Sequence, residues 1–201
     1  MTAVTGADGR ARCPWAKGEL YERYHDVEWG VPLHGDVPLF EKLSLEGFQS
    51  GLSWIVVLRK REAFRAAFAG FDPEVVAGFG DDDVARLLGD AGIVRNRLKI
   101  EAVIANAQAI TRLREREGDG ALDALVWSYA SPPRGVLDRP QALTDVPAST
   151  QASKDLAKAL KREGLRFVGP VTVYALMQSA GLVDDHLAGC WRASEVVRSA
   201  A

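Results

Sequence analysis

Apolar residues recur at intervals of three and four along much of the chain, the spacing that places them on one face of a helix. Strands that are half buried show instead an alternation of apolar and polar positions, and no convincing stretch of that kind is present in the sequence. The pattern therefore predicts an all-α fold. The clearest helical stripe comprises Ile100, Val103, Ile104, Ala107, Ile110 and Leu113.

Helix-capping residues divide this pattern into segments. Asp36 is placed to begin a helix that runs through Gly51, and Ser53 to begin another that runs through residues 69–71. Asp72–Pro73 is the usual combination of an N-cap and a first helical residue. These signals predict a succession of helices joined by short turns.

Length and composition suit one substantial core, since 47% of the 201 residues are hydrophobic. We expect a flexible extension over 1–11, a single unit of two helical lobes around a cleft over 12–192, and a tail over 193–201. Residues 131–150 hold four of the nine prolines and are predicted to form a surface loop or connector. The first ten residues resemble no signal peptide, and eighteen consecutive apolar residues occur nowhere. We therefore expect a cytoplasmic monomer without a membrane partner.

Charge is unevenly distributed, although the formal net charge is only −2. Segments 59–65, 95–99 and 154–166 hold twelve of the 25 Lys and Arg residues, and acidic residues gather in 72–90. This distribution suits a basic face for a polyanion, but it also suits the solvated faces of ordinary helices.

Residues 164–181 are predicted to form a helix, a short glycine hairpin and a second helix. Gly169 allows close approach of another backbone, and the amides at the start of the following helix would suit a phosphate. We take Gly169 and the preceding Val168 as candidate DNA-binding residues, in a motif that grips the DNA backbone without reading its sequence. The alternative is a plain antiparallel helix pair capped by glycine.

Each end of the chain carries one cysteine and one histidine: Cys13 with His25, and His186 with Cys190. A reducing compartment favours thiols or metal thiolates over a disulfide, and these four residues have the nitrogen and sulfur donors that zinc prefers. Four protein ligands leave no position for water, so such a zinc would be structural and would join the two ends. Alternatively, the cysteines are small buried hydrophobes and the histidines ordinary polar groups, because the spacing matches no standard finger. The remaining histidine, His34, is predicted to lie at the surface.

Aromatic residues and one carboxylate gather in the first third of the sequence: Tyr21, Tyr24, Trp29, Glu46 and Trp54. Glu46 stands among apolar and small residues, where burying a carboxylate is costly without a partner or a task. A flipped base needs an aromatic face and a polar group for its edge, which Trp54 and Glu46 could supply. The alternative places the aromatic residues in the core and Glu46 on an exposed helix face.

Four segments, taken together, resemble the 3-methyladenine DNA glycosylase I family of the helix-hairpin-helix superfamily. They are "YHDVEWGVP", "LEGFQSGLSWIVVLRKRE", "DAGIVRNRLKIEAVIANA" and "RFVGPVTVYALMQSAGLVDDHLAGC". The resemblance extends in order from about Cys13 to Cys190. It implies a structural zinc on the four cysteine and histidine residues.

The resemblance also assigns roles in the pocket. It implies that Glu46, the candidate catalytic residue, recognises an extrahelical methylated base through hydrogen bonds. Trp54 would stack on that base, and Tyr24 with Tyr21 would line its pocket.

The resemblance further implies a monofunctional enzyme. Superfamily members that also cut the DNA backbone carry a lysine nucleophile two residues after the last hairpin glycine, and this chain has Val171 there. Two cysteines exclude an iron–sulfur cluster bound by four thiolates. Asp184 and Asp185 are the acids nearest to the hairpin; we interpret Asp185 as orienting His186 or capping a helix.

The predicted function is therefore hydrolysis of the bond between 3-methyladenine and its sugar in double-stranded, alkylated DNA. A non-catalytic reader of damaged DNA with the same fold is the main alternative. An RNA or nucleoside hydrolase is a third class, which the basic segments make less suitable than an enzyme acting on a polymer.

Overall fold

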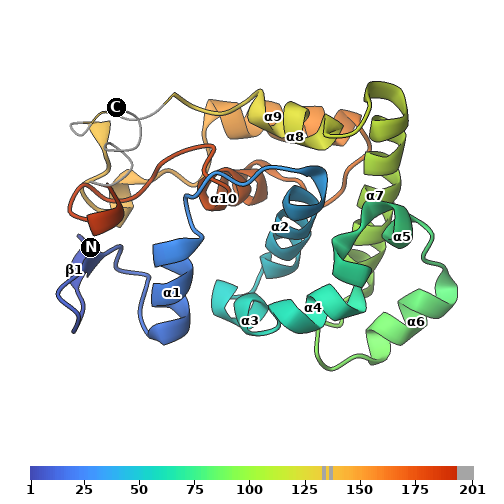
Figure 1. Cartoon of the computed structure of the whole chain (residues 1–201), viewed down its shortest axis with the longest axis horizontal. Helices are drawn as coiled ribbons and strands as arrows, with labels where there is room; N and C mark the ends of the chain where they lie inside the picture. Colours follow the sequence, from blue (N-terminus) through green and yellow to red (C-terminus); the bar gives the residue numbers. More distant parts are fainter. Residues whose placement is uncertain (133–134, 136–137, 194–201) are drawn as a thin grey trace.

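The computed structural model describes residues 1–132, 135 and 138–193, and these residues form a mostly helical fold (Figure 1). The predicted tail over 193–201 lies outside them except for Ala193. Within the described part of the chain, no helix is long and apolar enough to cross a membrane. The longer helices are α1 (Glu19–Val27), α2 (Asp36–Gln49), α6 (Asp81–Gly89), α7 (Arg97–Glu117), α9 (Gln151–Arg162) and α10 (Pro170–Ser179); the shorter ones are α3 (Trp54–Arg59), α4 (Arg61–Ala67), α5 (Pro73–Ala77) and α8 (Ala121–Trp127).

The N-terminus corrects the all-α prediction. Strands β1 (Val4–Thr5) and β2 (Ala11–Arg12) pair in antiparallel fashion, and strands of two residues are too short to show an alternating pattern in the sequence. The Arg12 guanidinium donates hydrogen bonds to the carboxylates of Asp8 and Asp26 and so ties this hairpin to α1. The flexibility of residues 1–11 stays a prediction.

Asp36 has a different role from the predicted one. The N-cap of α2 is Gly35, and the carboxylate of Asp36 accepts hydrogen bonds from the backbone N–H groups of Gly120 and Asp123, at 3.2 and 2.9 Å. These amides belong to the N-terminus of α8, which has orphan donors like any helix start. Asp36 therefore caps a helix that is remote in sequence, and joins α2 to α8.

The predicted helix over 53–71 is divided into α3, α4 and the 3₁₀ turn η1 (Ala69–Phe71). The break falls at Lys60, whose ammonium donates to the carbonyl oxygens of Ala91 and Gly92, 2.7 and 3.2 Å away. The next boundary was predicted correctly, because the carboxylate of Asp72 accepts from the backbone N–H of Glu74 and caps α5.

Helix α7 confirms the apolar stripe between residues 100 and 113, since all six of its members are buried. Helices α5, α6 and α8 pack on α7, and α2 packs on α8 and α10. One main apolar cluster extends through these helices from Leu39 to Val183. A smaller apolar cluster consists of the two cysteines, Leu187 and Ala193.

The second helix predicted within residues 164–181 is confirmed as α10, whereas the helix before the connection is α9, which ends at Arg162, ahead of the predicted segment. The two helices pack on each other, and α10 also packs on α2 (Figure 1). Gly181, with φ +78°, follows α10, and a Cβ there would lie 2.7 Å from the backbone nitrogen of Pro32. Only glycine allows this close approach of the segments after α1 and α10. The loop over 131–150 contains the 3₁₀ turn η3 (Leu143–Asp145), and residues 133–134 and 136–137 lie outside the described part.

Candidate active site and metal cluster

A pocket of about 310 Å³ opens between α1, α2, α3 and α10. It brings together all four pocket residues proposed from the sequence, although they lie on three different helices. Aromatic and polar side chains share its wall, the usual composition of a site for a planar, polar ligand. The lining residues are Trp15, Tyr21, Tyr24, Trp29, Glu46, Gln49, Trp54, Leu143, Val146, Ala175, Gln178 and Asp185.

Glu46 lies in the last turn of α2 and is only 5% exposed. The hydroxyl of Ser179 donates a hydrogen bond to its Oε1 at 3.3 Å. Burial raises the pKa of Glu46 to about 7, against the opposing effects of Lys42 and of the Ser179 hydrogen bond. The sequence argument that Glu46 is a costly buried carboxylate is confirmed, and the alternative of an exposed helix residue is wrong.

The aromatic wall is held by contacts between α1 and α3. The ring centroids of Tyr24 and Trp54 lie 5.5 Å apart, and Tyr24 is 3% exposed. The hydroxyl of Tyr21 accepts a hydrogen bond from the backbone N–H of Ile55 at 2.9 Å. The indole Nε1 of Trp54 is buried and has no hydrogen-bond partner among the residues that the structure describes, so it is a donor available to a ligand.

Sequence reasoning missed several residues of the wall. Trp15 packs edge-on against Trp29 with ring centroids 5.2 Å apart, and Gln49, Gln178 and Asp185 add polar groups. Trp15 carried a usable signal, since it is a large aromatic residue two positions after Cys13. Gln49 carried a signal too, because it follows Glu46 by three residues on the same helix. Gln178 carried none, because only the tertiary structure brings α10 to the pocket.

Asp185 does not orient His186, which corrects one interpretation. Its Oδ2 accepts hydrogen bonds from the hydroxyl of Tyr174 at 2.5 Å and from Gln178 Nε2 at 2.8 Å, and it faces the pocket. Oδ1 of the neighbouring Asp184 accepts a hydrogen bond from the backbone N–H of His186 at 3.1 Å, in a segment without a helix, so neither aspartate caps a helix there. Asp184 also forms a buried ion pair with Arg139.

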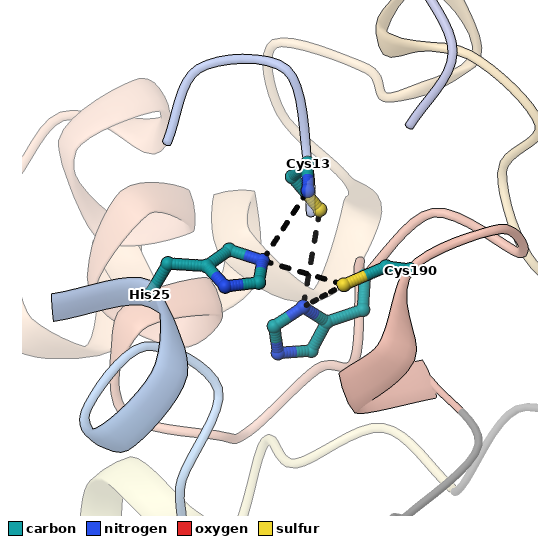
Figure 2. Close-up of side chains that lie close together, drawn as sticks. Cys13, His25 and Cys190 are labelled. Carbon is teal, nitrogen blue, oxygen red and sulfur yellow. Dashed lines mark hydrogen bonds between the residues drawn. The ribbon is translucent and has the colours of Figure 1, made fainter. Parts of the chain in front are cut away.

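The four predicted metal ligands meet in one buried cluster (Figure 2). Their donor atoms all lie within 4.8 Å of one another, and none of the four residues is more than 3% exposed. Cys190 Sγ lies 3.4 Å from His25 Nε2 and 3.6 Å from His186 Nδ1, and Cys13 Sγ lies 3.9 Å from His186 Nδ1. Donor atoms around a tetrahedral zinc with ordinary bond lengths lie about 3.3–3.8 Å apart. The donor set fits a zinc ion, and the two distances from Cys190 Sγ lie within this range, whereas the distance from Cys13 Sγ to His186 Nδ1 is slightly longer.

Both imidazoles are oriented from outside the cluster. His25 Nδ1 lies 2.9 Å from the carboxylate of Asp26, which also accepts from Arg12, and His186 Nε2 lies 3.2 Å from the carbonyl oxygen of Trp29. Such outer contacts fix which ring nitrogen faces a metal. Gly30 leaves room for the second contact, because a Cβ at this φ of +79° would lie 2.9 Å from His186 Nε2.

The thiol of Cys190 has a lowered pKa, because hydrogen bonding with the Cys13 thiol and then with His186 and His25 favours its thiolate. A thiolate is the form of cysteine that binds metals. The same hydrogen bond between the thiols raises the pKa of the Cys13 thiol, so one of the two cysteines has the form that binds a metal and the other is its hydrogen-bond donor. His34, by contrast, is exposed, as predicted.

Gly169 and Val168 stand at the start of α10. Gly169 is the N-cap residue, and a Cβ added to it would meet no atom of the described chain within 4 Å. Val168 is 1% exposed and belongs to the main core, so only its backbone is available to a ligand. Val171, which the sequence resemblance places where a lysine nucleophile would stand, is 61% exposed.

Many of the clustered cations have partners within the chain. Arg61 is paired with Glu28 and Arg65 with Glu41, and Lys99 donates to the carbonyl oxygen of Phe48. These pairings favour the interpretation of solvated, partnered helix faces for much of segments 59–65 and 95–99.

Comparison with known proteins agrees with this geometry. Residues 15–193 match the family model of the methyladenine glycosylases. The chain is 48% identical over 180 residues to DNA-3-methyladenine glycosylase 1 of Escherichia coli (strain K12), covering 89% of this chain and 95% of the relative. It is 46% identical to DNA-3-methyladenine glycosylase of Haemophilus influenzae (strain ATCC 51907 / DSM 11121 / KW20 / Rd), covering 89% and 96%.

Solved structures are similar over the same range. A crystal structure of 3-methyladenine DNA glycosylase I has a TM-score of 0.84 at 46% identity, covering 90% of this chain and 98% of that one. A tyrosine-to-phenylalanine variant of such an enzyme, in complex with 3-methyladenine, has a TM-score of 0.82 at 35% identity, covering 90% and 96%. With the family model matching most of its length and close relatives covering it almost end to end, the chain belongs to the methyladenine glycosylase family.

Proposed function

We propose that this protein is a DNA glycosylase that hydrolyses the N-glycosidic bond of 3-methyladenine in alkylated DNA. The observation that carries the proposal is the aromatic pocket with the buried Glu46 at its end, in a chain of this family. A related structure that holds 3-methyladenine supports the choice of base.

The chemistry of the substrate suits the pocket. Methylation at N3 makes the base cationic, so the bond to the sugar is weakened and the base leaves without strong acid catalysis. The carboxylate of Glu46 accepts hydrogen bonds from the base and favours its charge, and Trp54 and Tyr24 offer faces for stacking. A cation over such a ring gains about 0.5–2 kcal/mol, which unmodified adenine lacks. Water then meets the positively charged sugar.

DNA would be held beside the pocket by the connection between α9 and α10, which we propose to be a helix-hairpin-helix motif. Support comes from Gly169, whose open N-cap position exposes the amides at the start of α10. The target nucleotide must leave the base stack to enter the pocket. Val171 offers no amine, so no Schiff base forms and the enzyme is monofunctional.

The cysteine and histidine cluster would hold one structural zinc ion. All four ligands come from the protein, so zinc would supply cross-linking of the two ends of the chain and no site for water. We further propose a cytoplasmic monomer, in which residues 12–192 form one unit of two lobes around the cleft.

The test is release of free base. Purified protein is incubated with methylated double-stranded DNA, and the released bases are identified by chromatography, with spontaneous release subtracted. We expect 3-methyladenine to appear while 7-methylguanine stays on the DNA. Binding without release would favour the non-catalytic reader, and activity on RNA or free nucleosides would favour the third class.

A further inference from the structure

Lys42 lies directly behind the aromatic wall of the pocket and is only 8% exposed. Its ammonium is 5.0 Å from the ring centroid of Tyr24 and 5.8 Å from that of Trp54. It donates a hydrogen bond to the hydroxyl of Tyr24 at 3.5 Å. A positive charge is thus buried against the two rings that would receive a cationic base, a position where it would be harmful unless it serves another group.

That group is Glu46, which stands four residues further along α2. Residues at this spacing are neighbours on a helix surface. Ser179 connects the two side chains, because its hydroxyl donates to Glu46 Oε1 at 3.3 Å and it lines a small pocket together with Lys42. The positive charge of Lys42 and the hydrogen bond from Ser179 both lower the pKa of Glu46, against the larger effect of burial. The other titratable groups at this end of the pocket are Tyr24 on α1 and Asp185, whose carboxylate accepts from Tyr174 and Gln178.

A second pocket keeps Lys42 in contact with solvent from the opposite side. It has a volume of about 160 Å³ and is lined by Lys42, Ser179, Glu28 and apolar residues between α1 and α2. Such a volume has room for several water molecules, each of which needs about 10–15 Å³ on this measure. Burial lowers the pKa of Lys42, whereas the carboxylates of Glu46, Glu28 and Glu41 raise it against Arg61. The pKa is lowered overall, and both these acids and the room for water in the pocket oppose that effect and favour a charged ammonium.

We propose that Lys42 is a positioning residue that holds Glu46 as a carboxylate, so that the pocket presents a negative charge to a cationic methylated base. The inference rests on the proposed function for the identity of the base. Lys42 acts through Glu46 and does not line the base pocket itself.

Loss of Lys42 should change the pH dependence of base release. Glu46 has a raised pKa of about 7, and Lys42 is the largest influence that keeps it from rising further. Without Lys42, Glu46 would keep its proton to higher pH. Base release would then be lost as pH falls through this higher value, while at high pH, where Glu46 is ionised in both proteins, the rates would converge.

The experiment compares wild type with Lys42→Met under single-turnover conditions from pH 6 to 9.5. In wild type the rate of base release should fall on the acidic side of its pH profile, as Glu46 takes up a proton. We expect the midpoint of this acidic limb to be higher in Lys42→Met by at least about one pH unit, the lower end of the shift caused by a neighbouring opposite charge. At pH values below both midpoints, base release would fall by about tenfold or more. Lys17→Met, the same change at an exposed residue, should leave the limb where it is. An unmoved limb in Lys42→Met would overturn the proposal.

A second measurement reads Glu46 without DNA. The ¹³C shift of its side-chain carboxyl is followed against pH, with the signal assigned by its loss in Glu46→Gln. The midpoint should be higher in Lys42→Met than in wild type, and Lys42→Gln, which keeps a polar end toward the second pocket, should behave in the same way. Equal midpoints would refute the role of Lys42 even in an active enzyme. Failure of the wild type to release 3-methyladenine would instead refute the proposed function and leave this titration valid.

Discussion

At the scale of single residues, the site depends on burial of a charge that the sequence already marked as unusual. Burying a carboxylate in an apolar stretch is costly unless it has a hydrogen-bond partner or a function. Glu46 is buried and accepts a hydrogen bond from the hydroxyl of Ser179. The sequence does not mark Lys42 in this way, because a lysine next to a glutamate on a helix normally extends its ammonium to solvent. Its contact with two aromatic rings is a product of how α1 and α3 pack on α2.

Glu46→Gln should slow release of 3-methyladenine about 10- to 100-fold, because glutamine keeps the size of the side chain but loses its charge. The magnitude corresponds to one hydrogen bond to a charged group, roughly 1.5–3 kcal/mol. Single-turnover kinetics on methylated DNA measure the rate, and fluorescence anisotropy on the same DNA measures affinity, which should change much less. Glu115→Gln, at an exposed position, is the matched control. Unchanged kinetics in Glu46→Gln would remove it from the recognition of the base.

At the scale of elements, the start of α10 combines an open glycine with free helix amides. Gly169 has φ −70°, so its backbone is one that any residue adopts, and no strain explains the glycine. Nothing within the described chain fills the space beside it either. Gly169 therefore leaves room for close approach by something outside the protein, which in this proposal is the DNA backbone.

Gly169→Ala should therefore weaken DNA binding while leaving stability almost unchanged. We expect affinity to fall by roughly tenfold, the loss of about one charge-assisted hydrogen bond. Fluorescence anisotropy and urea unfolding measure the two quantities separately. Gly80→Ala is a matched control, because Gly80 is also an N-cap glycine with negative φ and open space, on α6. Equal affinities for the two variants would argue against DNA contact at the hairpin.

At the scale of the whole molecule, the cysteine and histidine cluster joins the N-terminal segment and α1 to the segment that follows α10. Cys13 precedes α1, whereas His186 and Cys190 follow α10. The base pocket lies beside this junction, since Trp29 contacts His186 and also lines the pocket. A metal cross-link here would restrict the unfolded chain over almost its full length.

Cys190→Ala should abolish binding of one equivalent of zinc and lower the free energy of unfolding by about 2–5 kcal/mol, the range for losing a cross-link that closes a long loop. Atomic absorption gives the metal content, and urea unfolding gives the stability. His34→Gln, which changes the one histidine outside the cluster, should keep both values. A Cys190→Ala protein with full zinc and unchanged stability would contradict the proposed site.

The fold could be predicted best where periodicity alone decides the structure. The stripe of α7 and the cap at Asp72 were predicted correctly, because both depend on residues close in sequence. Asp36 was misassigned, because its partners are amides of α8. The break between α3 and α4 was missed because no glycine or proline marks it in the sequence.

The sequence by itself determined the helical character of the chain, the candidate metal ligands and the central pocket residues. It could do so because residue types and their spacing carry that information, and because long motifs resemble a known family. Only the tertiary structure decided that Gln178 and Asp185 share the pocket and that Lys42 lies behind it. These relations depend on the packing of helices that are distant in sequence, and burial and electric field at a site are properties of that packing.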